Sequence, residues 1–422
     1  MKNYRKIFLL VLISVSLAFA GQIGPWSHFK AVTSNFTVNA GDTLTINAGT
    51  EVRFSQGTIM TIFGVVLSNG TSSDPVIFAA LDPANPSWGG ITIKNTDPLQ
   101  ISVFNSTIFT KMYSYGDGAI NIEESSVNFN NCKFLDNHAD VHGGAVYAVA
   151  GNVNFITCIF KNNNANQGGG IYVYNNPVDA ASTINISKCT FLNNSATDGG
   201  AVYVEDFALA AFDMIMVIEN SGFHYNKAGG GNGGGLFFNV LSHLDLTFRF
   251  CKIQYNVAFS GGGIYAKFNE MSGENVLPQK FTNLLISENT APDGSGFYFN
   301  SGLTQNPMAF IFENTTIAYN YLNPSKGSKE IGGGGIHIVS NNNYPIIKNS
   351  IIWANGNELW LDQFMIEDDT FPDPNLIFGY CDIDGEQSFG IGGISEDPVF
   401  VRPPKPLAVT GDITIVDADR FD

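Results

Sequence analysis

Charged residues make up only 14% of this 422-residue chain, well below the usual quarter. Basic residues are the scarcer kind: 21 Lys and Arg stand against 38 Asp and Glu, for a net charge of −17. This acidity argues against nucleic-acid binding and against docking on anionic lipid, because both partners are themselves negative. Disorder is excluded as well, since 44% of the residues are hydrophobic and 13% are aromatic.

Long apolar runs are absent after the N-terminus. Residues 1–20 combine Lys2, Arg5 and Lys6 with an apolar stretch and end in Ala18-Phe19-Ala20, a pattern typical of a secretory signal peptide. A membrane anchor is the alternative, but the stretch is shorter than the roughly 20 residues of a span. We therefore expect no integral membrane span after signal removal, and an extracellular, cell-surface or outer-membrane-associated location.

Two short motifs alternate along most of the chain, and no 3.6-residue helical stripe accompanies them. In the first, an aromatic or aliphatic residue is followed three positions later by Asn, at intervals of 26 to 35 residues. These residues are Asn137, Asn163, Asn194, Asn226, Asn256, Asn289, Asn320 and Asn355. The second motif is Gly-Gly-small-aliphatic-aromatic, as in residues 143–147. A repeat of this length is typical of a solenoid.

Hydrophobic residues after each glycine pair alternate with period two, as in Ile171-Tyr172-Val173-Tyr174, which indicates strands. We predict an all-β fold: a single right-handed parallel β-helix of about eleven or twelve rungs with terminal caps. The expected segments are a signal peptide (1–20), an N-terminal segment and cap (21–39), the β-helix (40–400, with 361–400 as terminal rung and C-cap) and a tail (401–422).

Equivalent side chains of successive rungs should stack inside such a helix. One inner aliphatic ladder is predicted at Ile120, Val146, Ile171, Val202, Leu236, Ile264, Phe297 and Ile336. The repeated Asn residues should form a second ladder at a bend, where the amide bonds backbone groups and a left-handed dihedral is tolerated. The glycine pairs suit positions of positive φ or close rung approach.

Cysteine is sparse and odd in number, at five residues. Four stand two residues before the Phe or Ile of the first motif: Cys132, Cys158, Cys189 and Cys251. The equivalent positions of other repeats are assigned to Ser106, Ser221, Leu284, Thr315 and Ser350. We interpret this as a ladder of inward free thiols, with a disulfide between adjacent rungs as the alternative. Metal-site spacings are absent.

Aromatic residues recur directly after the inner aliphatic position, and strand alternation points them outward. This aromatic row comprises Tyr147, Tyr172, Tyr203, Phe237, Tyr265 and Tyr298. We expect it to stack along one exposed face, with Glu205, Asn239, Lys267 and Asn300 two residues further on. The row would stabilise the sheet, or it would bind a glycan or protein, or both.

The Phe-x-x-Asn and Gly-Gly-Ala-Val motifs resemble the repeats of chlamydial polymorphic outer membrane proteins. The segments 43–52, 349–353 and 396–400 resemble secreted bacterial right-handed β-helix proteins of the pectate-lyase-like class. The chlamydial resemblance implies a surface adhesin. We accordingly expect a non-catalytic, adhesin-like or envelope-associated protein whose ligand is a glycan or a surface protein.

The alternative is a carbohydrate-active enzyme of the same fold class, a polysaccharide lyase or glycoside hydrolase, with acids from insert loops 206–220, 268–282 and 361–376. Asn95-Thr96-Asp97 and Asp368-Asp369 match single polygalacturonase motifs, but the accompanying Gly-His-Gly and Arg-x-Lys are missing. His138-Ala-Asp140-Val-His142 would place three metal ligands together only on an extended strand, and we interpret it as a solvated loop. We therefore assign no catalytic residue, metal site or cofactor.

Overall fold

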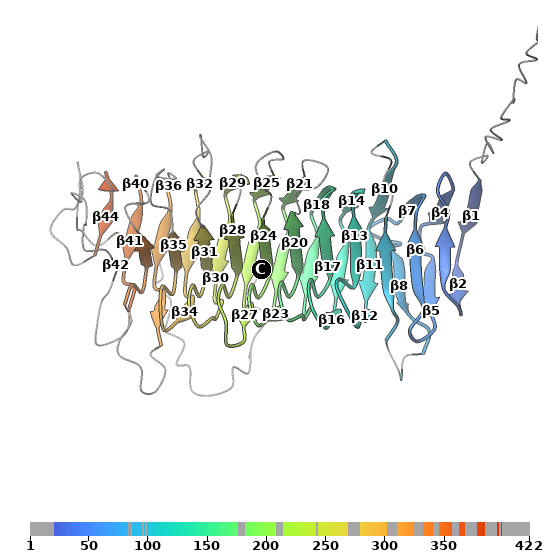
Figure 1. The fold of residues 1–422 in the computed structure, drawn as a ribbon, viewed down its shortest axis with the longest axis horizontal. Helices are drawn as coiled ribbons and strands as arrows, with labels where there is room; N and C mark the ends of the chain where they lie inside the picture. The colour runs from blue at the N-terminus through green and yellow to red at the C-terminus, as the bar shows by residue number, and fades with distance from the viewer. Residues whose placement is uncertain are drawn as a thin grey trace, which may run out of the picture.

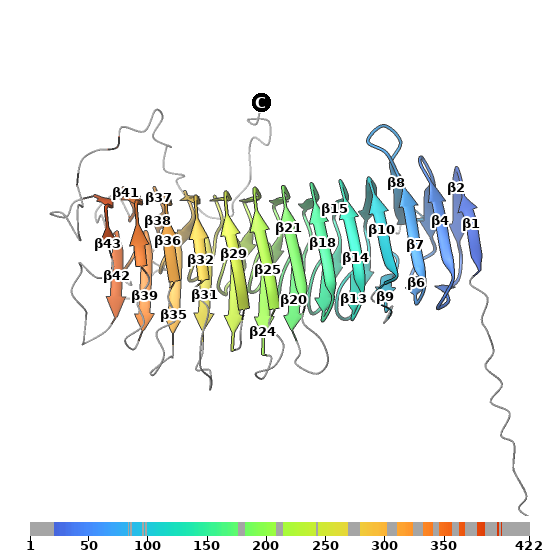
Figure 2. The same ribbon diagram turned by 90° about the horizontal axis from the view of Figure 1, so that it is seen from above.

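The protein is described by a computed structural model in which parallel strands form one long stack (Figures 1 and 2). The residues described are 21–82, 84, 87–94, 97, 99–175, 182–207, 214–241, 244–268, 279–301, 310–323, 332–340, 346–356, 363–367, 378–384, 395 and 398. None of these residues is helical, and within them no helix is long and apolar enough to cross a membrane. The predicted signal peptide and tail lie outside the described residues, as do Asp368 and Asp369.

Sheet A contains every first strand of a turn. In spatial order its strands are β1 (Gln22–Trp26), β4 (Thr43–Asn47), β7 (Val65–Asn69), β10 (Ile101–Asn105), β14 (Ser126–Asn130), β18 (Asn152–Ile156), β21 (Thr183–Ser187), β25 (Met214–Glu219), β29 (Leu244–Arg249), β32 (Gln279–Thr282), β36 (Phe310–Glu313), β40 (Ile346–Lys348) and β43 (Phe378–Gly379).

Sheet B contains the second strands. They are β2 (Phe29–Val32), β5 (Glu51–Phe54), β8 (Val76–Ala80), β11 (Thr107–Thr110), β15 (Lys133–Leu135), β19 (Ile159–Lys161), β22 (Thr190–Leu192), β26 (Gly222–His224), β30 (Lys252–Gln254), β33 (Leu285–Ser287), β37 (Thr316–Ala318), β41 (Ile351–Trp353) and β44 (Asp382–Ile383).

Sheet C contains the third strands, most of which follow a glycine pair. They are β3 (Phe36–Val38), β6 (Ile59–Ile62), β9 (Gly90–Ile93), β13 (Ile120–Glu123), β17 (Val146–Val149), β20 (Ile171–Asn175), β24 (Val202–Asp206), β28 (Leu236–Val240), β31 (Ile264–Phe268), β35 (Phe297–Ser301), β39 (Ile336–Ser340) and β42 (Phe364–Glu367).

Three two-stranded pairs lie at the turn between sheets B and C. They are β12 (Tyr113–Ser114) with β16 (His138–Ala139), β23 (Ser195–Ala196) with β27 (Lys227–Ala228), and β34 (Thr290–Ala291) with β38 (Tyr321–Leu322).

Each strand pairs in parallel with its equivalent one turn away, for example Val146 with Ile171 and Ile171 with Val202. The predicted single right-handed parallel β-helix is confirmed. Sheets A and B have 13 strands and sheet C has 12. The extra rung relative to the prediction comes from residues 22–38, which form β1 to β3 and pair with β4 to β6. The helix therefore begins before residue 40, and the segment expected as a cap is itself a rung.

The core is one continuous column of inward side chains between the three sheets, and every residue of the predicted aliphatic ladder is fully buried in it. Phenylalanines of sheet B stack face to face, with ring centroids 4.6 Å apart for Phe160 and Phe191 and 4.8 Å apart for Phe191 and Phe223. Rung spacing accounts for this, since strands about 4.8 Å apart hold flat rings near contact distance. Burying each ring stabilises the fold by roughly 1.5–3 kcal/mol.

From Ser106 to Ala354, left-handed residues mark two corners of each turn. One precedes the cysteine position, and the other immediately precedes the ladder Asn, as Asp136 does at φ 55° and Tyr225 at φ 55°. The left-handed dihedral expected at the Asn itself thus falls on its neighbour. The reason is that the two residues contribute differently to the corner. The neighbour turns the chain, while the Asn side chain points inward and bonds backbone groups.

The first glycine of each pair has the expected positive φ, as Gly143 does at 60°. The second glycine permits close approach between rungs, because a Cβ at Gly144 would lie 2.2 Å from the carbonyl oxygen of Gly169. Backbone geometry therefore requires the glycine pair where it precedes a strand of sheet C, as it does before β17, β20, β24, β28, β31 and β39.

Candidate binding surface on sheet C

The aromatic row lies on the outer side of sheet C, on strands β17, β20, β24, β28, β31 and β35. Equivalent residues pair directly across rungs, as Tyr172 does with Tyr203 and Tyr265 does with Tyr298. The buried members form a hydrophobic cluster of their own, separate from the central core. The outward register predicted from strand alternation is therefore what the structure has.

The rings of the row stack on one another. Their centroids are 5.0 Å apart for Tyr172 and Tyr203, 4.6 Å for Tyr203 and Phe237, and 4.8 Å for Tyr265 and Tyr298, with interplanar angles of 5° or 6°. Each inner ring of the row therefore has both faces against its neighbours. A sugar ring or an apolar side chain would meet ring edges here, not open faces.

The row is also far less exposed than alternation suggests. Tyr172 is 1% exposed, Tyr203 4%, Phe237 7% and Tyr265 9%, while Tyr147 and Tyr298 are partly buried. The expectation of an exposed strip is wrong. Stacking covers the ring faces, the His142 ring lies 4.3 Å from that of Tyr172, and the backbone of Gly199 lies against the Cβ of Tyr203.

Hydroxyl groups of the row are held by polar residues of the next outward position. The Tyr172 hydroxyl donates to Glu205, and Asn239 donates to the same carboxylate at 3.4 Å. Burial, followed by the bond to Glu205, raises the pKa of Tyr172 well above its usual range. Burial likewise raises the pKa of Tyr203 and of Tyr265. These phenols stay protonated and act as hydrogen-bond donors in a packed layer.

The Asn residues of the first motif form a continuous hydrogen-bonded ladder inside the bend after sheet B. Asn194 is representative: its Nδ2 donates to Asn226 Oδ1 at 3.0 Å and to the Phe160 carbonyl at 2.9 Å. Its backbone N–H donates to the same Asn226 Oδ1 at 3.0 Å. The amide thus links three rungs, and all eight Asn side chains are buried.

Gln363 ends this ladder at the C-terminal side. Its Oε1 accepts from the Nδ2 of Asn355 at 3.0 Å and from the Asn355 N–H at 3.2 Å. The side chain thereby takes the place of the next Asn, and it is buried. Sequence reasoning missed Gln363, because it lies outside the repeat motif. The only signal was that the buried N–H and Nδ2 donors of the last ladder residue, Asn355, need an acceptor.

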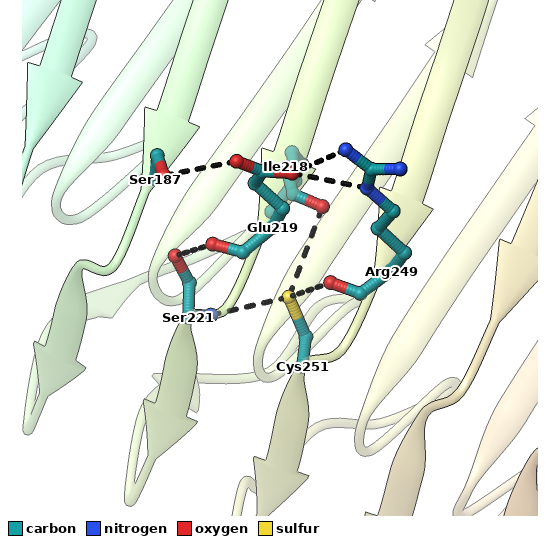
Figure 3. Close-up of polar contacts among 6 residues, drawn as sticks. All are labelled: Ser187, Ile218, Glu219, Ser221, Arg249 and Cys251. Carbon is teal, nitrogen blue, oxygen red and sulfur yellow. Dashed lines mark hydrogen bonds and ion pairs between the residues drawn. The ribbon is translucent and has the colours of Figure 1, made fainter.

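Cysteines line the corner between sheets A and B. Figure 3 shows one such site: Cys251 Sγ donates to the carbonyls of Arg249 at 3.2 Å and Ile218 at 3.8 Å, and accepts the Ser221 N–H. Outside this corner, Arg249 Nη2 bonds Glu219 Oε2 at 2.7 Å. Ser221 Oγ makes the equivalent bonds one rung earlier: it donates to the Glu219 carbonyl at 2.8 Å and accepts the Cys189 N–H at 3.0 Å, which explains the exchange of Cys with Ser.

All five cysteines are free and buried. Burial raises the pKa of Cys251 to about 12 and also raises the pKa of Cys158, Cys189 and Cys381. The fifth, Cys381, occupies the same ladder position, two residues before Ile383, and was not assigned from the sequence. These thiols are structural.

One assignment in this ladder is corrected. Thr107, fully buried, occupies the cysteine position of its rung, whereas Ser106 is the left-handed residue before it, at φ 41°. The error of one position arose because that rung lacks both the Cys and the Asn that fix the register elsewhere.

His138 and His142 do not converge. His138 lies in β16, a short strand where a loop was expected, and its Nε2 contacts Asp140 Oδ1 at 3.0 Å. His142 Nδ1 instead contacts Asp117 Oδ1 at 2.7 Å, on the preceding rung. Within the described residues no group of three or more His, Cys, Asp or Glu side chains is arranged to hold a metal ion.

A segment of one repeat in the middle of the helix matches a known family. Residues 188–205 match the Chlamydia polymorphic membrane protein repeat. This repeat spans the corner cysteine Cys189, the ladder residue Asn194, the glycine pair and Tyr203, so it contains one position of every ladder described above. The repeat family suggests an outer-membrane or surface protein. Comparison with curated proteins gave no match.

Proposed function

We propose that the protein is secreted and acts at the outer membrane or cell surface as an adhesin-like, non-catalytic binding protein, with a glycan or a surface protein as its ligand. The observation that carries this proposal is the membrane-protein repeat at residues 188–205, whose ladder positions recur along the 13-rung stack. A rigid rod with laterally repeated surfaces suits multiple weak contacts to an extended ligand.

The packing of the aromatic row limits the groups on sheet C that such a ligand could contact. Ring faces are occupied, so contact on sheet C would involve ring edges and the outward polar residues Glu205, Asn239, Lys267 and Asn300, all partly exposed. The role of the row itself is then mainly to stabilise the sheet.

Location and binding are tested together. Protease treatment of intact cells of the source organism should degrade the protein while a cytoplasmic marker survives, and purified full-length protein should bind cells or immobilised surface glycans saturably. A protein protected in intact cells, with no saturable binding, would contradict the proposal. Release of reducing or unsaturated ends from polysaccharides would replace it with the enzymatic alternative.

A further inference from the structure

An exposed cluster of three rings and one carboxylate lies at the turn between sheets B and C, beside β12 and β16 (Figure 1). The rings of Tyr113 and His138 stack at 4.7 Å, and those of Tyr113 and Tyr115 meet edge to face at 5.0 Å. The Tyr113 hydroxyl donates to Asp140 Oδ1 at 2.9 Å, and His138 Nε2 lies 3.0 Å from the same oxygen.

We propose that Tyr113, Tyr115, His138 and Asp140 form a binding site for an uncharged sugar ring, with Tyr115 as the stacking platform and Asp140 as the hydroxyl acceptor. The proposal rests on the proposed binding function and names its ligand class. It also moves the expected aromatic contact from the row on sheet C, where ring faces are covered, to a turn where one is open.

Tyr115 supplies the open face. Its side chain is 83% exposed, in contrast to the buried rings of the aromatic row. Its backbone is nevertheless fixed: Ser114 Oγ accepts from the Gly116 N–H at 3.3 Å and donates to the Asp117 carbonyl at 3.1 Å. The Val141 N–H of the next rung donates to the Gly116 carbonyl at 3.2 Å. A ring held ready on an ordered turn costs little conformational entropy on binding.

Asp140 supplies the polar contact. Both of its bonds go to Oδ1, and no described residue donates to Oδ2, while 39% of the side chain is exposed. A carboxylate oxygen accepts strongly from a sugar hydroxyl, and an aromatic face packs against the C–H face of a pyranose. The two groups together present what one sugar ring requires.

The charge and the ring arrangement limit the ligand class. Asp140 and the net charge of −17 disfavour uronic or sialic acids. A quaternary ammonium ion would need several faces around one point. Here the face of Tyr113 is taken by His138, which leaves a flat platform and not a cage.

The test uses immobilised neutral oligosaccharides (chitotetraose, maltohexaose, cellohexaose and lactosamine repeats), with polygalacturonate, sialylated lactosamine and choline as charged probes. Full-length protein should bind at least one neutral chain. Tyr115→Ala should weaken that binding about tenfold or more. Asp140→Asn, which retains an Oδ1 acceptor for Tyr113 but replaces Oδ2, should weaken it severalfold.

Phe259→Ala is the matched control. Phe259 follows the inward Ala258 as Tyr115 follows Ser114, and it is 49% exposed. This variant should bind as the wild type does. Unchanged binding in Tyr115→Ala, preference for a charged probe, or the absence of neutral-sugar binding would overturn the site. Cell binding that survives Tyr115→Ala would leave the proposed function standing and this inference refuted, whereas loss of all cell and glycan binding by the wild type would refute both.

Discussion

Two aromatic stacks run along this molecule, one inside the core on sheet B and one on the outer side of sheet C. Inside, Phe160, Phe191 and Phe223 stack at 4.6 and 4.8 Å. Outside, Tyr172, Tyr203 and Phe237 stack at 5.0 and 4.6 Å. The outer rings face away from the core yet remain nearly as buried as the inner ones. Rung spacing, and not the side of the sheet, decides whether repeated flat rings bury their faces.

The comparison shows that a repeated row of aromatic residues need not be a binding surface. A row of outward aromatics in a sequence usually indicates a partner surface. In a β-helix the rings of such a row can pack against one another, because the neighbouring rung supplies the stacking partner. An aromatic residue whose equivalent on the next rung is not aromatic is then the more informative signal for binding. Tyr115 is such a residue, because the equivalent position on the next rung is Asp140.

The largest expected effect lies in the inner stack. Phe191→Ala removes a fully buried ring from between two others, and we expect it to lower the free energy of unfolding by about 3–5 kcal/mol. Denaturant titration followed by circular dichroism would measure this. Phe191→Leu should cost clearly less, and equal losses for the two variants would argue against ring stacking as the cause.

The second largest effect is expected in the outer stack. Tyr203→Ala removes a ring that is 4% exposed, and the expected loss in the free energy of unfolding is about 2–4 kcal/mol. Tyr115→Ala is the matched exposed control and should change that quantity by less than about 0.5 kcal/mol. If Tyr203→Ala were as stable as the control, the outer rings would not be packed as described.

The third largest effect is expected in the Asn ladder. Asn226→Ala leaves the Asn194 amide and the Phe191 carbonyl without their buried partner, so we expect a loss of about 2–3 kcal/mol in the same titration. Asn152→Ala, on an exposed outward position of β18, serves as control. Comparable stability of the two variants would contradict the role of the ladder.

The smallest effect is expected at the cysteine corner. Cys251→Ser should alter the free energy of unfolding by less than about 1 kcal/mol, because Ser221 already occupies the equivalent corner one rung earlier. Native Cys251, with a pKa raised to about 12, should react slowly with a thiol reagent at pH 8 and rapidly once unfolded. Rapid native labelling would show that the thiol is not inward.

Much of this fold could be predicted from the sequence, because its elements repeat. Alternation identified the inner ladder through Val146, Ile171 and Val202, and the Asn spacing identified the rungs. The exposure of Tyr172 could not be predicted, since it depends on the His142 ring and on neighbours one rung away. Gln363 was missed because a ladder end has no repeat to mark it.

Tyrosine modification by tetranitromethane, mapped by mass spectrometry on the folded protein, tests the central claim most directly. We predict rapid nitration of Tyr115 and Tyr380, which are 83% and 66% exposed, and protection of Tyr172, Tyr203 and Tyr265 until the protein unfolds. Nitration of these three at rates comparable to Tyr115 would contradict a packed outer stack and would restore the aromatic row as an open binding strip.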